Sequence, residues 1–107
     1  APVAVVVCGD PSASGLWVED CSIAAVTMQY AAHELGLASR WAQMKGNNFS
    51  EGTTSTQYIA ELLGLPESLT VQCIIGIGYP GEEMVPYKKD ELRFDKVSYN
   101  RYGQKKP

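Results

Sequence analysis

The chain has 107 residues, of which 45% are apolar and 20% are charged, and its formal net charge is −3 at pH 7. These values are typical of one small globular domain, and we expect residues 1–107 to form a single domain. The negative charge argues against nucleic acid as the main partner. No apolar run is long enough to span a bilayer, so we expect no membrane contact.

The first predicted element is a strand over Pro2–Cys8, a continuous β-branched run. Because this run does not alternate with polar residues, we interpret it as a buried, central strand. The chain begins directly with this strand and shows no basic segment typical of a signal peptide. Three widely spaced cysteines (Cys8, Cys21 and Cys73) fit reduced, buried thiols better than a disulfide framework or zinc site. We therefore expect a cytoplasmic protein without a metal site.

A long helix is predicted over Val18–Leu35, and it is the element around which the rest is organised. Its apolar residues go most of the way round, which is typical of a helix buried in a core or between subunits. Glu19 and Asp20 place negative charge on the first turn, where the helix dipole favours it. Gly36 stands where a capping glycine belongs. The helix should therefore end there and lead into a small-residue turn, Ala38–Trp41.

The second half of the chain is predicted to hold a loop, a short helix, a strand and a polar tail. The loop covers Asn47–Thr56; the helix covers Thr56–Leu63, with Ser55 as its cap and Gly64 as its stop; the strand covers Thr70–Ile77. Two apolar strands separated by helices favour a parallel α/β sheet. Because so few elements would leave apolar surface exposed, we expect a partner chain or further residues to complete the fold.

The charge is unevenly distributed along the chain. Residues 88–107 hold seven basic and three acidic residues, which gives this segment a net charge of +4. The first 87 residues hold two basic and nine acidic residues, which gives them a net charge of −7. Such a tail is expected to clasp an acidic surface, to meet an anionic group, or to remain solvated.

Side chains alone give little support for catalysis. His33 is the only histidine and lies within the predicted helix, so neither a nucleophile–base pair nor a second metal ligand stands out. The glycines at 76, 78 and 81 complete a GxGxxG pattern, but a proline and a polar segment follow instead of a phosphate-binding helix. A cofactor that brings its own chemistry fits these residues better.

Four segments together resemble the nitroreductase family of FMN-dependent oxidoreductases. In chain order they are PVAVVVCGD, WVEDCSIAAVTMQYAAHELGLASRW, IAELLGLPESLTVQCIIGIGYPGEE and PYKKDELRFDKVSYNRYG. The resemblance runs from Pro2 to Gly103. It implies an α+β sandwich with a mostly antiparallel sheet, in contrast to the parallel reading above, and an intertwined homodimer with the long helix at its interface.

The resemblance also implies a cofactor and a reaction. FMN would pass electrons from NAD(P)H to a nitroaromatic, a quinone or a similar acceptor. By similarity to the family, Ala38, Ser39, Arg40 and Trp41 would contact the flavin with backbone groups. Lys89, with Lys88 beside it, would hold the FMN phosphate, where the family commonly has Arg; a lysine offers a point charge instead of a two-pronged donor. The family often has Gly in place of Ala38.

The sequence departs from the family in what it lacks. The arginine-rich phosphate-binding segment and the Asn-containing loop that open family members have no counterpart, so we interpret the chain as the C-terminal two-thirds of the fold. FMN binding by this polypeptide alone should then be reduced or absent. Two alternatives to an active enzyme stay open: a non-catalytic, truncated flavin-binding or dimerisation remnant of the family, and an unrelated small α/β binding domain with a basic tail.

Overall fold

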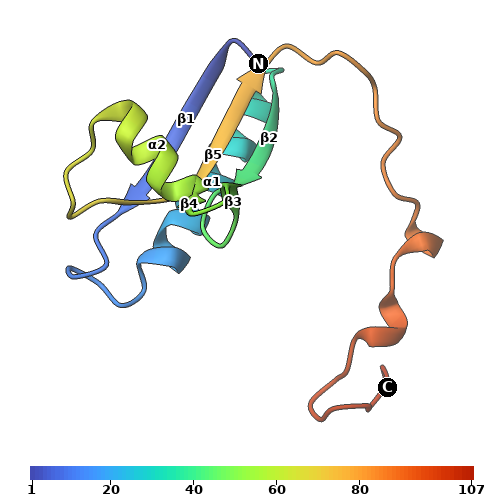
Figure 1. The fold of residues 1–107 in the computed structure, drawn as a ribbon. Helices are drawn as coiled ribbons and strands as arrows, with labels where there is room; N and C mark the ends of the chain where they lie inside the picture. Colours follow the sequence, from blue (N-terminus) through green and yellow to red (C-terminus); the bar gives the residue numbers. More distant parts are fainter.

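A three-stranded antiparallel sheet forms the centre of the molecule. The computed structural model describes all 107 residues, and the strand order is β1-β5-β2 (Figure 1). The strands are β1 (Val3–Gly9), β2 (Ala38–Gln43) and β5 (Thr70–Gly78). β5 is the central strand because it pairs with both β1 and β2, and its Val71, Cys73 and Ile75 are all 0% exposed.

The sheet corrects two expectations drawn from hydrophobicity alone. All strand pairs are antiparallel, so the parallel reading was wrong, and β1 lies at an edge instead of in the middle. A continuous apolar run indicates that both faces of a strand are buried, but it does not indicate the direction of the strand or its position in the sheet. The α+β architecture implied by the family resemblance is correct.

Helix α1 (Trp17–Glu34) covers one face of the sheet, close to the predicted bounds. Gly36 has φ +77°, and the N–H of Leu37 donates to the carbonyl of Ala32 at 2.8 Å while the N–H of Gly36 donates to that of His33 at 3.0 Å. This is the Schellman arrangement, which requires the left-handed conformation that glycine adopts readily. The chain is thereby turned directly into β2, so Ala38–Trp41 is a strand and not the predicted turn.

The core lies between α1 and the sheet and is small. It consists of five buried residues, with four partly buried ones packed against it: Val7, Cys21, Ala25, Cys73 and Ile75, then Trp17, Met28, Trp41 and Ile77. Only 8 of the 107 residues are buried, which leaves much of the apolar surface open. On α1, Ile23 is 63% exposed and Tyr30 73% exposed, so within one chain this helix is not buried all round as its composition predicted.

A short hairpin and a second helix follow β2. β3 (Asn48–Ser50) and β4 (Thr53–Thr54) form a hairpin inside the segment predicted as a loop. Helix α2 (Ser55–Leu63) is capped by Thr54, one residue before the predicted Ser55, through a capping box with Gln57. In Figure 1, α2 lies in front of the sheet and α1 behind it. The Thr56 hydroxyl donates to the Val71 carbonyl at 3.0 Å and fixes α2 to β5.

The residues after β5 form an exposed tail that runs away from the sheet (Figure 1). Two short 3-10 turns interrupt it, η1 (Lys89–Glu91) and η2 (Phe94–Lys96). The radius of gyration is 18.0 Å, whereas a compact chain of this length would have about 13 Å. The tail therefore contributes almost nothing to the core. None of the helices has the length and hydropathy required to cross a bilayer.

Candidate functional site

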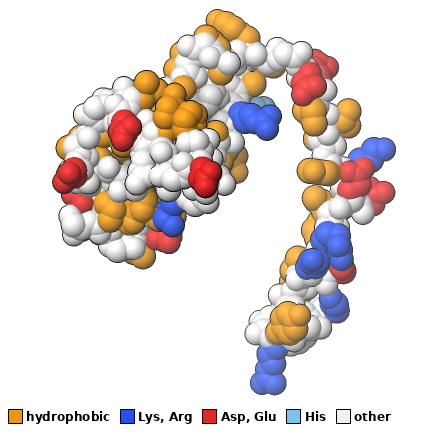
Figure 2. All heavy atoms as spheres, in the orientation of Figure 1, with side chains coloured by type: hydrophobic (Ala, Val, Ile, Leu, Met, Phe, Trp, Pro, Cys, Tyr) orange, Lys and Arg blue, Asp and Glu red, His pale blue; other side chains and the backbone are white.

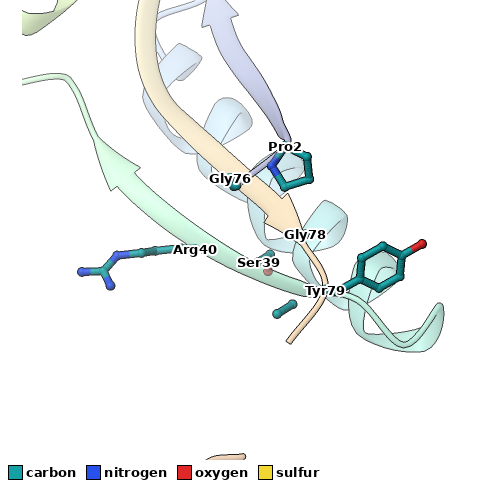
Figure 3. A pocket seen from close by; sticks show the side chains of 8 residues that line it. Pro2, Ser39, Arg40, Gly76, Gly78 and Tyr79 are labelled. Carbon is teal, nitrogen blue, oxygen red and sulfur yellow. The ribbon is translucent and has the colours of Figure 1, made fainter. Parts of the chain in front are cut away.

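A hollow of about 390 Å³ lies where β5 ends and β2 begins; we call it the sheet hollow. Its lining comes from the start of the chain and from both strands: Ala1, Pro2, Ala38, Ser39, Arg40, Gly76, Gly78 and Tyr79. Figure 3 shows these strand ends together, with Arg40 and Tyr79 extending toward opposite sides. The volume lies within the range of about 300–1,000 Å³ that small-molecule sites occupy.

Strand register gives the sheet hollow a floor of very small side chains. Ala38 pairs with Gly78, and Gly76 pairs with Arg40 on one side and with Ala4 on the other. Paired residues of antiparallel strands share a face, so all five belong to the face opposite α1. Arg40 is the only long side chain among them. The lining of the sheet hollow on this face is therefore made mostly of small residues.

The two glycines of this floor allow close approach. A Cβ built on Gly78 would lie 2.9 Å from Cδ of Pro2, and one on Gly76 would lie 3.4 Å from Cβ of Ala1. Glycine inside a strand marks the close approach of another backbone or a ligand. In this chain it lets Ala1 and Pro2 lie against the end of β5.

The outer edge of β2 adds hydrogen-bonding capacity. β2 pairs with β5 alone, so its other edge has no strand partner. An edge strand presents a row of free N–H and C=O groups. The backbone of Ala38–Trp41 can thus bind the polar edge of a ligand, which is the kind of contact that the resemblance implies.

Only three of the four β2 residues predicted to bind the cofactor line the sheet hollow. These are Ala38, Ser39 and Arg40; the guanidinium of Arg40 is exposed, forms no ion pair, and is the only charged side chain in the lining. Trp41 pairs with Ile75 and packs against the core on the α1 face, and its indole N–H donates to Oε1 of Gln43 at 3.0 Å. Trp41 can therefore contribute backbone groups to this site but not its ring.

The predicted phosphate ligands lie elsewhere in the chain. Lys88 and Lys89 are exposed residues of the tail, and neither lines the sheet hollow. Lys89 instead lines a second hollow formed within the tail itself. The structure of the single chain thus brings the predicted ring-binding residues together but does not bring the lysines to them.

The three thiols do not line the sheet hollow, and their pKa values are raised. Burial raises the pKa of Cys8, of Cys21 and of Cys73 above the ordinary value, and mutual repulsion raises the pKa values of Cys21 and Cys73 further. A thiol is nucleophilic only as the thiolate, so these groups are poor nucleophiles at neutral pH. No group of three or more metal-ligating side chains is placed to hold an ion.

Sequence reasoning missed the contributions of β5 to the sheet hollow. Gly76, Gly78 and Tyr79 line it, although the glycine pattern had been considered only as a phosphate-binding loop. The signal was present in another form: two glycines at a spacing of two place both absent side chains on one face of a strand. The glycine spacing does not indicate which strand lies beside these two glycines.

The comparisons with known proteins agree with this fold. The model of the nitroreductase family matches residues 1–79. Two curated archaeal relatives, from Archaeoglobus fulgidus and Methanothermobacter thermautotrophicus, share the provisional name NADH dehydrogenase/NAD(P)H nitroreductase and are each 35% identical to this chain. The matched regions cover 85% and 95% of this chain, which spans about half the length of these relatives (52% and 51%).

Solved structures give the same result. An FMN-dependent nitroreductase from Clostridium difficile R20291 superposes with a TM-score of 0.92 at 40% identity, over 95% of this chain and 59% of that one. A nitroreductase with bound FMN from Desulfitobacterium hafniense gives 0.69 at 30% identity, over 94% of this chain and 52% of that one. With the family model covering most of the residues and a matching fold, this chain belongs to the nitroreductase family.

Proposed function

We propose that this chain is part of an FMN-dependent oxidoreductase of nitroreductase type, which passes electrons from NAD(P)H to a nitroaromatic, a quinone or a similar acceptor. Family membership and the FMN named in two structural relatives support the proposal. The observation that carries it is the sheet hollow, where a floor of Gly and Ala lies beside the free edge of β2.

The residues of the sheet hollow fit a flavin ring. Ala1 and Pro2 lie over Gly76 and Gly78, and together with Ala38 they give the hollow a lining of small side chains against which a ring could lie. The β2 edge supplies backbone donors and acceptors for the polar side of the ring. The Arg40 side chain offers further donors, and its unpaired guanidinium favours negative charge nearby.

When bound, FMN would supply the electron-transfer chemistry, and the protein would position it and adjust its electrostatics. The part played by Ala38, Ser39 and Arg40 is to orient the ring through backbone contacts. The phosphate of FMN would be held by Lys89 with Lys88 as its neighbour. Because both lysines lie on the extended tail, this role requires the tail to approach a sheet hollow, and a second copy of the chain offers one.

We further propose that the chain forms an intertwined homodimer. Ile23, Val26 and Tyr30 recur along α1 at helical spacing and are 63%, 40% and 73% exposed, which makes an apolar stripe without a partner in one chain. The tail carries an excess of four positive charges, and the first 87 residues an excess of seven negative ones. Figure 2 shows Lys and Arg gathered on the far half of the tail, so the tail is suited to another copy's acidic surface.

A second candidate function is a non-catalytic flavin-binding or dimerising remnant of the same family. It is favoured by one feature of the sheet hollow, whose lining holds a single charged side chain, Arg40. A phosphate normally requires several charge-assisted hydrogen bonds. The family's ring-binding surface could therefore be present without tight binding of the whole cofactor.

The test is a flavin titration of the purified chain with two matched pairs of variants. Ala38→Leu should abolish binding, whereas Ala42→Leu, also on an exposed position of β2 but outside the lining, should not. Lys89→Ala should raise the FMN dissociation constant by roughly tenfold or more, since a hydrogen bond to a charged group contributes about 1.5–3 kcal/mol. Lys96→Ala, which removes the same charge elsewhere in the tail, should change it little.

The outcomes separate the two candidates. A flavin absorbance spectrum together with nicotinamide-dependent reduction of a nitroaromatic would support the enzyme. FMN or riboflavin binding without turnover would support the remnant. If neither flavin binds, or if Ala38→Leu and Ala42→Leu behave alike, the assignment of the sheet hollow is wrong.

A further inference from the structure

Arg40 is an isolated cation in an acidic part of the chain. Residues 1–87 hold nine acidic side chains and only two basic ones, Arg40 and Lys45. The one ion pair of the molecule joins Arg93 to Asp95 in the tail, so Arg40 pairs with none of these acids. In the lining of the sheet hollow Arg40 is the only charged side chain. An anionic ligand that approaches this part of the molecule therefore finds one compensating charge beside a cavity.

Strand register leaves the Arg40 side chain without neighbours that would hold it. Arg40 pairs across the sheet with Gly76, which has no side chain, and the other edge of β2 has no strand partner. Two residues away along β2 lie Ala38 and Ala42, whose methyl groups are too short to cover a guanidinium. Cross-strand pairs are the contacts that normally stabilise a strand side chain. The Arg40 side chain is exposed and extends away from the strands (Figure 3), so its N–H groups are free to bind a ligand.

A free guanidinium beside small side chains suits one class of ligand. Its N–H donors form a rigid planar fork that matches the two oxygens of a carboxylate. The nearby side chains of Ala1, Pro2 and Ala38 offer an apolar surface to the rest of such a ligand. An aromatic carboxylate meets both requirements in one small molecule. A neutral analogue of the same shape would keep the apolar contact and lose the charge-assisted pair.

We propose that Arg40 is a specificity-determining residue, which makes the site selective for aromatic acceptors that carry a carboxylate. The inference rests on the proposed function for the reaction, and it adds the substrate class. Backbone groups of β2 would orient the flavin, which leaves the Arg40 side chain available to the acceptor. Arg40 is the longest side chain of the lining. It reaches past a ring that lies against the strands and binds the carboxylate beyond it.

The test compares para-nitrobenzoate with para-nitrobenzamide, which has the same ring and nitro group but no charge. Each is titrated into the full-length chain in the presence of FMN at about 0.02 M salt, where exposed charges are weakly screened. Binding is followed by NMR shifts of the β2 amides. The wild-type chain should bind para-nitrobenzoate roughly fivefold more tightly than para-nitrobenzamide. This preference should shrink at about 0.5 M salt, because the ion pair is exposed.

The decisive variants change the two cations of residues 1–87 one at a time. Arg40→Gln should reduce the preference to about one-to-one. Lys45→Gln removes the same charge from an exposed residue outside the lining, and it should keep the wild-type preference. Arg40→Lys retains the charge without the fork and should retain part of the preference. Equal affinities of the wild-type chain for the two compounds would overturn the proposal, as would equal losses of preference in Arg40→Gln and Lys45→Gln.

The same titrations with and without FMN separate this inference from the proposed function. The measured quantity is the ratio of two affinities, so any effect of Arg40 on flavin binding is common to both compounds and cancels. If FMN binds and Arg40→Gln leaves the ratio unchanged, the flavin assignment stands and the inference fails. If FMN does not bind but Arg40 still selects para-nitrobenzoate, the carboxylate site stands and the proposed function fails. Arg40 and Lys45 are exposed and outside the core, so the variants should leave the fold of the sheet intact.

Discussion

The exposed stripe on α1 gives a quantitative prediction for the proposed homodimer. Full burial of a large apolar side chain contributes about 1.5–3 kcal/mol. Scaled by the exposed fractions of Ile23, Val26 and Tyr30 (63%, 40% and 73%), this gives about 3–5 kcal/mol per protomer and roughly 5–10 kcal/mol for a symmetric pair. Association costs about 4–15 kcal/mol in lost motion. The stripe alone therefore comes close to balance, and contacts from the tail would decide the affinity.

The perturbation is Tyr30→Asp. In a two-fold dimer it acts twice, and losing two tyrosines that are each 73% exposed in the free chain removes about 2–4 kcal/mol before the cost of burying a carboxylate is counted. The dissociation constant should rise at least about thirtyfold, since about 1.4 kcal/mol corresponds to a factor of ten.

Sedimentation velocity over a dilution series measures this constant directly. Leu62→Asp is the matched control, because Leu62 is 66% exposed and lies on α2, outside both the α1 stripe and the tail. The reasoning is refuted if the wild-type chain sediments as a monomer throughout, or if Tyr30→Asp and Leu62→Asp shift the constant equally.

Three further predictions concern the core, the thiols and the floor of the sheet hollow. Ile75→Ala should lower the free energy of unfolding by about 2–5 kcal/mol in urea titrations, because Ile75 is 0% exposed and its loss leaves a cavity; a change below about 1 kcal/mol would contradict the described core. The pKa of Cys73 and of the other thiols is raised on folding, so their contribution to stability is complete below the unfolded pKa of about 8.5 and is lost as the pH rises through the folded pKa values. Urea unfolding midpoints should therefore fall as the pH rises above about 8.5, and Cys8→Ala should make this fall shallower. If the variant shows the same fall as the wild type, groups other than Cys8 cause it. Gly78→Ala should weaken flavin binding because the added Cβ would meet Pro2 at 2.9 Å, whereas Gly81→Ala, with nothing within 4 Å, should not; equal affinities would mean that Pro2 moves aside freely.

Local features of the chain could be predicted from sequence because they depend on neighbouring residues. The Gly36 and Gly64 stops hold, with φ of +77° and +65°, since a left-handed residue that ends a helix is a local requirement. The bounds of α1 and β5 lie within about one residue of those expected. The cap of α2 fell on Thr54 instead of Ser55 because Gln57 is placed to close a capping box with Thr54.

The sequence by itself determined the family and the two helices and two apolar strands, α1, α2, β1 and β5. The cofactor contacts of β2 remain a prediction from the resemblance. Tertiary structure decided the direction and order of the strands, and hence that Gly76 and Gly78 lie beside Ala38 and Arg40 on one face. It also decided that Trp41 faces the core, and that Lys89 meets Lys105 and Lys106 in the tail instead of joining the sheet hollow. Hydrophobic periodicity reports which side chains are buried, but pairing between residues far apart in the chain depends on register and on chain reversal, which no local pattern encodes.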